Sequence, residues 1–232
     1  MNIYQKTKSH FFKKLFKNGK ISFAQSGEDM ILSTILWNVK NGFYIDIGAN
    51  NPFIQSNTYH FYKKGWRGLN IDALPNSMIA FRKHRRKDIN LECAISDKEE
   101  ILDYYMFSSS FYNSFSTEEI ENKKKVSELI EIRKIKTKKL SDILATYNIG
   151  NIDFMSIDVE GFDLNVLKSN DWIKYRPKIL ISEYYAQDLT NLRSNQVYIF
   201  LHQHRYEYFC NTPTNIFYID SDFLSVRFKR FK

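Results

Sequence analysis

Tyr44-Ile45-Asp46-Ile47-Gly48-Ala49-Asn50 is a heptapeptide in which an apolar strand ends in an acid and a glycine turn. The apolar side chains predict a strand over residues 43–47 that is covered on both faces, as in a parallel sheet. Gly48 lets the backbone turn sharply and leaves room for a ligand at the carboxyl end of the strand. Because ligands of open α/β sheets bind at that end, the heptapeptide indicates a ligand site.

Strand-like and helix-like patterns alternate along the rest of the chain. Strands are expected at 43–47, 68–71, 89–93, 102–107, 133–137, 153–158, 179–183, 206–210 and 215–220, and helices at 27–39, 57–64, 75–82, 141–147, 162–169 and 190–204. The repeated strand–helix units predict an α/β protein with a mostly parallel sheet and helices on both faces. Residues 108–139 interrupt the alternation and are expected to form a loop or a short helix over one face.

The formal net charge of the chain is +8, and the excess is concentrated at the two ends. Residues 1–20 hold six lysines and no acidic residue, and residues 227–232 hold four basic residues. We therefore divide the chain into a basic amphipathic segment 1–20, a single domain 21–226 and a basic tail 227–232. The segment 1–20 would contact an anionic membrane surface, or dock on the domain or on a second subunit of a homo-oligomer. The part between the ends is close to neutral, so charge does not indicate a nucleic-acid partner.

Two cysteines, Cys93 and Cys210, lie in apolar, strand-like contexts. Without a Cys-x-x-Cys pair or a Cys/His cluster, a structural zinc site is not expected. A reduced chain in the cytoplasm is the simplest interpretation. The N-terminal residues lack the apolar stretch of a secretory signal, and no apolar run approaches the ~18 residues of a membrane-spanning helix.

Acidic residues lie at the carboxyl ends of four of the predicted buried strands. These residues are Asp46, Asp72, Asp158 and Glu183. The carboxyl ends of parallel strands meet at one edge of a sheet, so we expect the four carboxylates to surround one ligand. Crowded carboxylates are unfavourable unless they bind a cation or hydroxyl groups, which indicates the kind of ligand.

The glycine turn discriminates between nucleotide-like ligands. A G-x-G-x-x-G turn cradles the pyrophosphate of a dinucleotide, whereas here a single glycine follows a carboxylate that would repel pyrophosphate. A carboxylate suits an ammonium or a sulfonium group, and S-adenosylmethionine carries both. Asp72 would bind its ribose, because the acid at the end of the second strand binds ribose hydroxyls in α/β nucleotide sites.

The chain resembles the FkbM family of S-adenosylmethionine-dependent methyltransferases. The matching segments are FAQSGED at 23–29, YIDIGAN at 44–50, SNT at 56–58, GWRG at 65–68 with Asp72, AIS at 94–96, IDVEG at 157–161 and PKILISE at 177–183. The resemblance implies a class I (Rossmann-like) methyltransferase fold with an antiparallel C-terminal strand pair, and usually O-methylation of a hydroxyl. Common substrates of the family are sugars of surface polysaccharides or secondary metabolites. The chain departs from the family at Asp72-Ala73, where the family often has Glu-Pro, and at Tyr185, where it often has histidine.

The expected cofactor residues lie at strand ends or in the matching segments. Asp46, Gly48 and Asn50 would surround the methionine part of S-adenosylmethionine, Asp72 would bind the ribose, and Ala94 would lie beside the adenine. The family resemblance also assigns Gln25 and Asn57 to the methionine carboxylate.

Asp158, Glu160 and Glu183 are the expected catalytic acids at the methyl acceptor. Small-molecule O-methyltransferases of this fold often hold a divalent ion at such strand ends, so Asp158 and Glu183 would bind Mg²⁺ or Mn²⁺ and lower the pKa of the acceptor hydroxyl. Alternatively, the acids bind sugar hydroxyls directly. His60 is a candidate base because its helix starts beside the glycine turn, although a lone histidine on a helix is more often structural.

Two alternatives to a sugar O-methyltransferase stay open at this stage. One is an NAD-dependent oxidoreductase, and the other is a non-enzymatic basic module that binds a surface. For the methyltransferase, the acceptor would be a sugar or a sugar nucleotide, and residues 108–139, residues 184–188 and the C-terminal strands would shape its pocket. The basic residues of segment 82–86, Arg85 among them, would meet a diphosphate or form solvated helix surface, and we favour the second.

Overall fold

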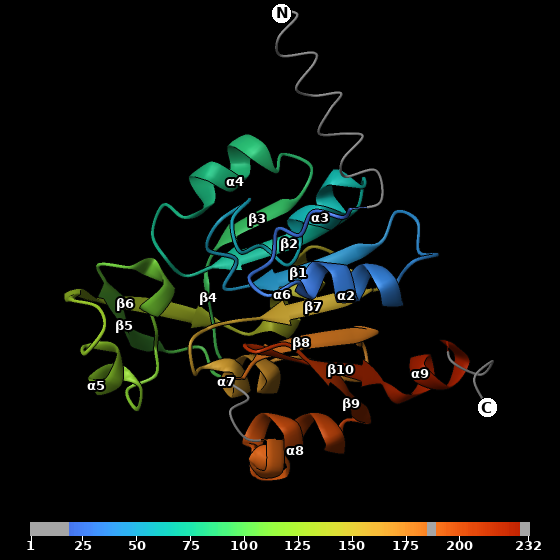
Figure 1. The fold of residues 1–232 in the computed structure, drawn as a ribbon. Helices are drawn as coiled ribbons and strands as arrows, with labels where there is room; N and C mark the ends of the chain where they lie inside the picture. The colour runs from blue at the N-terminus through green and yellow to red at the C-terminus, as the bar shows by residue number, and fades with distance from the viewer. Residues whose placement is uncertain (1–18, 185–188, 228–232) are drawn as a thin grey trace, which may run out of the picture.

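The computed structural model describes residues 19–184 and 189–227, and its centre is a seven-stranded sheet (Figure 1). The strands lie in the order β3-β2-β1-β7-β8-β10-β9. Their bounds are β1 (Phe43–Ile47), β2 (Arg67–Asp72), β3 (Ile89–Glu92), β7 (Phe154–Ile157), β8 (Ile179–Glu183), β9 (Tyr206–Asn211) and β10 (Asn215–Asp220). The first five strands in this order pair in parallel, and β10 pairs antiparallel with both β8 and β9. The predicted mostly parallel sheet with an antiparallel C-terminal strand pair is confirmed.

Helices cover both faces of this sheet, as the alternating pattern predicts. One face carries α2 (Glu28–Ile35), α3 (Tyr59–Lys63) and α9 (Ser221–Arg227), and the other carries α6 (Leu140–Thr146), α7 (Asp163–Lys168) and α8 (Gln196–Gln203). Side chains alternate along a strand, so β1 buries Tyr44 on the first face and Ile45 and Ile47 on the second. This two-sided burial explains the continuous apolar run of the heptapeptide.

The register of the parallel strands brings their carboxyl ends to one edge of the sheet. Ile47 of β1 pairs with Ile71 of β2 and with Ile157 of β7, and Ile157 pairs with Ser182 of β8. The residues that follow each paired position therefore lie at the same edge. They are Gly48, Asp72, Asp158 and Glu183.

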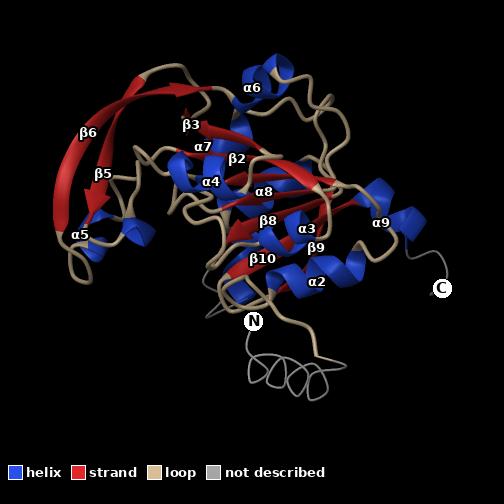
Figure 2. Ribbon diagram, turned by 90° about the horizontal axis from the view of Figure 1, so that it is seen from above, coloured by secondary structure: helices blue, strands red, loops and turns tan. Residues whose placement is uncertain are grey.

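A second sheet of three strands lies at one side of the first sheet (Figure 2). It is formed by β4 (Ala94–Ile95), β6 (Leu129–Lys138) and β5 (Ile101–Phe107), in that order. We call residues 101–138 the arm, which also holds the short helices η1 (Ser110–Tyr112) and α5 (Ile120–Lys123). The expectation of a loop or short helix over 108–139 is wrong in part, because β6 is ten residues long and pairs antiparallel with β5.

Several helix ends differ from the sequence predictions. The helix expected at 190–204 is divided into η2 (Leu189–Ser194) and α8, because the side chain of Asn195 accepts hydrogen bonds from Val197 N and Tyr198 N and caps α8. The helix expected at 75–82 is α4 (Met78–His84). Helix α2 ends at Ile35 rather than near residue 39.

The C-terminal boundary also needs a correction. Arg227, which we assigned to the basic tail, ends α9, and its Nε and Nη2 donate to Ile35 O at 3.0 and 2.7 Å. The tail residues 228–232 and most of the N-terminal segment, residues 1–18, lie outside the described residues. Within the described ranges, no helix combines the length and the apolar character needed to cross a bilayer.

Candidate functional site

A cavity of about 290 Å³ lies at the carboxyl edge of the main sheet, between the strand ends and the arm. All of the expected cofactor residues line it: Gln25, Asp46, Gly48, Asn50, Asn57, Asp72 and Ala94. The expected catalytic acids line it too: Asp158, Glu160 and Glu183. These residues come from segments that are up to 158 positions apart (183 − 25), and the fold brings them to one place.

Gly48 permits the close approach of two strand ends. Its φ is +82°, and a Cβ at this position would lie 1.7 Å from the carbonyl oxygen of Asp158. Any side chain here would therefore clash with backbone as well as strain the turn. The glycine lets the turn after β1 pack directly against the turn after β7.

Asp72 joins the ends of β1 and β2. Its Oδ2 accepts from Asn50 N at 2.8 Å, and its Oδ1 accepts from Leu74 N at 2.7 Å. Burial raises the pKa of Asp72, and the two backbone donors oppose that shift. Each carboxylate oxygen can accept a second hydrogen bond, so Asp72 is suited to bind a vicinal diol such as that of a ribose.

Asp46 is held from the side of α3. It is 6% exposed, and its Oδ2 accepts a hydrogen bond of 2.7 Å from Thr58 Oγ1. Burial raises the pKa of Asp46 to about 6, while the Thr58 hydroxyl and the charge of Arg85 oppose the shift. A buried carboxylate at a cavity wall is suited to a cationic ligand group, which would replace the lost solvation.

Asn50 and Asn57 connect the cavity wall to neighbouring segments. Asn50 has a φ of +45°, and its Oδ1 accepts from Ser110 Oγ of the arm at 3.1 Å. Asn57, which we assigned to the methionine carboxylate, donates from Nδ2 to Ser156 Oγ at 2.9 Å. The residue at the start of α3 is Thr58.

The acids of the matching segment 23–29 have a structural role. Glu28 Oε1 accepts from Thr212 Oγ1 and Asn215 Nδ2, at 2.6 and 3.1 Å, and Asp29 Oδ2 accepts from Phe23 N at 2.8 Å. Both acids are fully buried. They fix the ends of the loop that carries Gln25 to the cavity.

Three carboxylates gather on the other side of the cavity. One oxygen from each of Asp158, Glu160 and Glu183 lies within 4.8 Å of the others. Burial, followed by the charges of Glu183 and Glu160, raises the pKa of Asp158. Burial also raises the pKa of Glu160, and the nearby Lys123 opposes that shift.

Lys123 is a site residue that the sequence analysis missed. Its Nζ lies 2.9 Å from Glu160 Oε2 and donates to Glu160 O at 3.1 Å, while Ser114 Oγ donates to the same carbonyl at 2.7 Å. The segment 118–125 is nearly all charged, so it resembled solvated surface. The spacing of Ile120 and Lys123 could have indicated that Lys123 is buried, because residues three apart lie on one side of a helix. In the structure, both residues are 7% exposed.

Aromatic side chains from the arm line the cavity near the carboxylates. The rings of Tyr104 and Phe115 lie 4.6 Å apart between centroids, and Phe115 lies 5.6 Å from Phe162. Phe111 and Tyr112 of the arm also line the cavity. This part of the wall therefore combines flat apolar surfaces with carboxylates.

His60 and Arg85 differ from their predicted positions. His60 does not line the cavity; its Nε2 is buried and has no hydrogen-bond partner among the described residues, and burial lowers its pKa. The structure therefore does not support His60 as the base. Arg85 is not solvated surface but is fully buried, because its guanidinium pairs with Asp88 and with polar groups of three other segments.

Comparisons with known proteins point to one family. A family model described as Methyltransferase FkbM domain matches residues 46–210. Among curated proteins, none matches the chain significantly.

Solved structures give distant likenesses. A TehB-like SAM-dependent methyltransferase from Corynebacterium glutamicum has a TM-score of 0.43 at 8% identity and covers 94% of this chain and 98% of its own. A precorrin-6y C5,15-methyltransferase from Geobacter metallireducens has a TM-score of 0.45 at 12% identity, with coverages of 82% and 86%. A putative RNA methyltransferase from Pyrococcus horikoshii has a TM-score of 0.45 at 10% identity, with coverages of 88% and 91%.

Proposed function

Because this chain belongs to the FkbM methyltransferase family, we propose that it transfers the methyl group of S-adenosylmethionine to a hydroxyl group of a sugar. The sugar would be nucleotide-linked or part of a surface polysaccharide. The observation that carries the proposal is the single cavity that unites the expected cofactor residues with the carboxylates and aromatic rings.

The side chains in the cofactor half of the cavity match the chemical groups of S-adenosylmethionine. Asp72 would accept from the ribose hydroxyls, Asp46 would face the cationic methionine part, and Ala94 and Ile95, both almost fully buried, would flank the adenine. When bound, S-adenosylmethionine supplies a methyl group that its sulfonium activates. The task left to the protein is to hold the acceptor hydroxyl in line with that group and to receive its proton.

The acceptor half fits a sugar. The rings of Tyr104, Phe115 and Phe162 offer faces on which a sugar ring can stack. Asp158, Glu160 and Glu183 would accept hydrogen bonds from sugar hydroxyls and orient the one to be methylated. One of these carboxylates would accept the hydroxyl proton during transfer.

We also propose that the carboxylates of the acceptor half bind a divalent metal ion. Asp158 and Glu183 offer hard carboxylate oxygens, which Mg²⁺ and Mn²⁺ prefer. An ion held there would lower the pKa of the acceptor hydroxyl. Methyl transfer that is unaffected by EDTA and by added Mg²⁺ or Mn²⁺ would exclude the ion and leave the acids as direct ligands of the sugar.

We also propose that the reaction takes place in the cytoplasm. Cys93 and Cys210 are both free thiols, and reduced cysteines are typical of cytoplasmic proteins.

Methyl transfer from labelled S-adenosylmethionine to a panel of nucleotide sugars and oligosaccharides tests the proposal. We expect label in a sugar ether, with S-adenosylhomocysteine as the second product. Label in RNA or protein would overturn the sugar assignment. Binding of NADH without binding of S-adenosylhomocysteine would overturn the methyltransferase assignment.

A further inference from the structure

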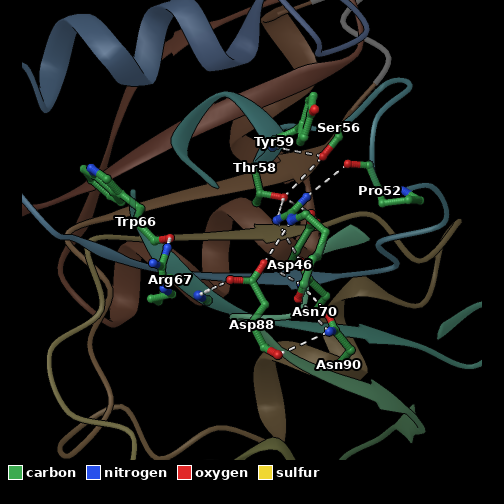
Figure 3. Close-up of polar contacts among 12 residues, drawn as sticks. Asp46, Pro52, Ser56, Thr58, Tyr59, Trp66, Arg67, Asn70, Asp88 and Asn90 are labelled. Carbon is green, nitrogen blue, oxygen red and sulfur yellow. Dashed lines mark hydrogen bonds and ion pairs between the residues drawn. The ribbon is translucent and has the colours of Figure 1, made fainter. Parts of the chain in front are cut away.

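Arg85 is the centre of a buried polar network between β1, β2, α3 and the residues after α4. Figure 3 labels Thr58, Asn70 and Asp88 among its partners. Its exposed fraction is 0%, as is that of the Asp88 side chain with which it forms an ion pair. Its nitrogen atoms donate to Asp88 Oδ2 at 2.9 Å, Pro52 O at 3.2 Å, Tyr44 OH at 2.7 Å, Thr58 Oγ1 at 3.0 Å and Asn70 Oδ1 at 3.3 Å. These contacts to five residues hold the planar guanidinium in a fixed orientation.

The contact between Arg85 and Thr58 fixes the direction of the Thr58 hydroxyl. Arginine carries donors and no acceptor, so Thr58 Oγ1 must accept from Arg85 Nη2. Thr58 Oγ1 also lies 3.2 Å from Ser56 Oγ. Because the ionised carboxylate of Asp46 can only accept, the single hydrogen of the Thr58 hydroxyl goes to Asp46 Oδ2, 2.7 Å away, and Ser56 then donates to Thr58. Arg85, Thr58 and Asp46 therefore form a chain of hydrogen bonds with one direction.

This chain ends at the cavity. The bond from Thr58 occupies Oδ2 of Asp46, and among the residues that the structure describes, none forms a hydrogen bond with Oδ1. Asp46 lines the cavity while Arg85 does not. The network thus holds a cavity carboxylate by one oxygen and leaves the other for a ligand.

We propose that Thr58 and Arg85 are positioning residues for the cofactor, which hold the Asp46 carboxylate so that Oδ1 meets the cationic methionine part of S-adenosylmethionine. The inference rests on the proposed function, because it takes that cofactor as the ligand. It adds two residues that do not touch the cofactor and act on it through Asp46.

Tyr44 provides a matched control. Its hydroxyl accepts from the same Nη2 of Arg85 at 2.7 Å and donates to Asp88 Oδ2 at 2.7 Å, so it belongs to the network but does not contact Asp46. Thr58→Val and Tyr44→Phe each remove one hydroxyl with little change of shape. Only the first breaks the path from Arg85 to Asp46.

The test is calorimetric titration of S-adenosylhomocysteine into wild-type protein and the variants Thr58→Val, Thr58→Ser and Tyr44→Phe, with thermal unfolding of each. Hydrogen bonds to charged groups contribute enough that we expect Thr58→Val to raise the Kd about tenfold or more. Thr58→Ser keeps the hydroxyl and should bind within about threefold of wild type. Tyr44→Phe should lower the Tm and leave the Kd unchanged.

If the wild-type protein binds S-adenosylhomocysteine, two results would overturn the inference. One is an unchanged Kd for Thr58→Val. The other is an equal rise of the Kd in Tyr44→Phe, which would show that the loss of affinity comes from a general loss of structure. If Thr58→Val does not fold, Thr58→Ala takes its place with the same expectation. Absence of S-adenosylhomocysteine binding by the wild-type protein would instead overturn the proposed function, and this inference with it.

Discussion

At the scale of single residues, position 48 is the one where the structure most clearly requires glycine. A Cβ there would overlap the Asp158 carbonyl oxygen, whereas a Cβ at Gly150 would meet nothing within 4 Å. We predict that Gly48→Ala abolishes cofactor binding and lowers the free energy of unfolding by more than about 2 kcal/mol, because the backbone must move and the left-handed φ is strained. Gly150→Ala is the control and should leave both quantities near wild type. Thermal unfolding and S-adenosylhomocysteine titration measure the two effects, and a Gly48→Ala protein with normal binding would refute this role.

Asp46 makes cofactor affinity depend on pH. Burial raises its pKa to about 6; Arg85 opposes the shift, and Asp72 and Asp88 add to it. A cationic ligand group would lower this pKa, so binding releases a proton when the pH is below about 6. We predict that the affinity for S-adenosylhomocysteine falls by up to about tenfold per pH unit as the pH drops from 6 to 5.

The variant Asp46→Asn isolates this effect, because an amide does not titrate in this range. Its affinity should be lower than that of wild type at pH 7.5 and should vary less between pH 5 and 7.5. Equal pH dependence in the two proteins would assign the effect to another group.

The sequence predicts the site residues unequally, for a physical reason. Asp46, Asp72, Asp158 and Glu183 lie at the carboxyl ends of apolar strands, so the topology of a parallel sheet brings them to one edge. Arg85 follows a basic helix end, a pattern that is usually solvated. Its burial depends on partners in β1, β2 and α3, and a local pattern does not reveal those.

At the scale of elements, the arm illustrates the same limit. The strand pattern at 133–137 was visible in the sequence. The charged segment that connects β5 to β6 has the composition of a solvated loop, so the sequence did not indicate that the two strands pair. The docking of α5 depends on Lys123, which meets Glu160 only in the folded chain. Tertiary contacts also decide the start of two helices, since Asn57 bonds to Ser156 before α3, and Ser169 Oγ accepts from Leu140 N at the start of α6.

Lys123 should anchor the arm to the acceptor half of the cavity. It pairs with Glu160 while almost fully buried, whereas Lys124, the residue after α5, pairs with Glu121 in solvent. We predict that Lys123→Ala raises amide hydrogen exchange across residues 108–127 by about tenfold or more, since breaking a buried pair is costly.

The matched variant Lys124→Ala should leave the exchange of this segment unchanged, because exposed pairs contribute little. Affinity for S-adenosylhomocysteine should stay near that of wild type in both variants, because Lys123 lies on the acceptor side. Equal exchange in the two variants would show that α5 docks without the Lys123 contact.

At the scale of the whole molecule, buried carboxylates should make the stability of the fold depend on pH. Burial raises the pKa of Asp46 to about 6 and of Asp163 to about 7, and it also raises the pKa values of Asp72 and Asp158. The folded state therefore binds protons more tightly than the unfolded chain. This contribution to stability is complete below about pH 4 and is lost as the pH rises through 6 to 7.

We predict that the Tm of the ligand-free protein falls by about 5 °C between pH 5.5 and pH 8. Thermal unfolding followed by circular dichroism measures this. Asp163→Asn should flatten the dependence, because its amide stays neutral at both pH values. A Tm that is constant or rises over this range would show that other groups dominate the linkage.

The overall architecture was the part best predicted from sequence. The bounds of β1 and β8 match the expected strands, because strands buried on both faces have continuous apolar runs. The parallel core followed by an antiparallel C-terminal pair also agrees. The family match over residues 46–210 covers β2, β3, β7, β8 and the arm. In the arm, the strands at 102–107 and 133–137 were predicted, but their pairing with each other and residues 129–132 of β6 were not.

The central claim is that the cavity at the carboxyl edge binds S-adenosylmethionine through Asp72 and its neighbours. Its most direct test is calorimetric titration of S-adenosylhomocysteine into wild-type protein, Asp72→Ala and the control Asp171→Ala. Asp171 also accepts from two backbone amides, those of Ile173 and Lys174, but lies outside the cavity. We predict one site per wild-type chain, affinity at least tenfold weaker for Asp72→Ala, and no change for Asp171→Ala. Absence of wild-type binding, or equal affinity in all three proteins, would contradict the account.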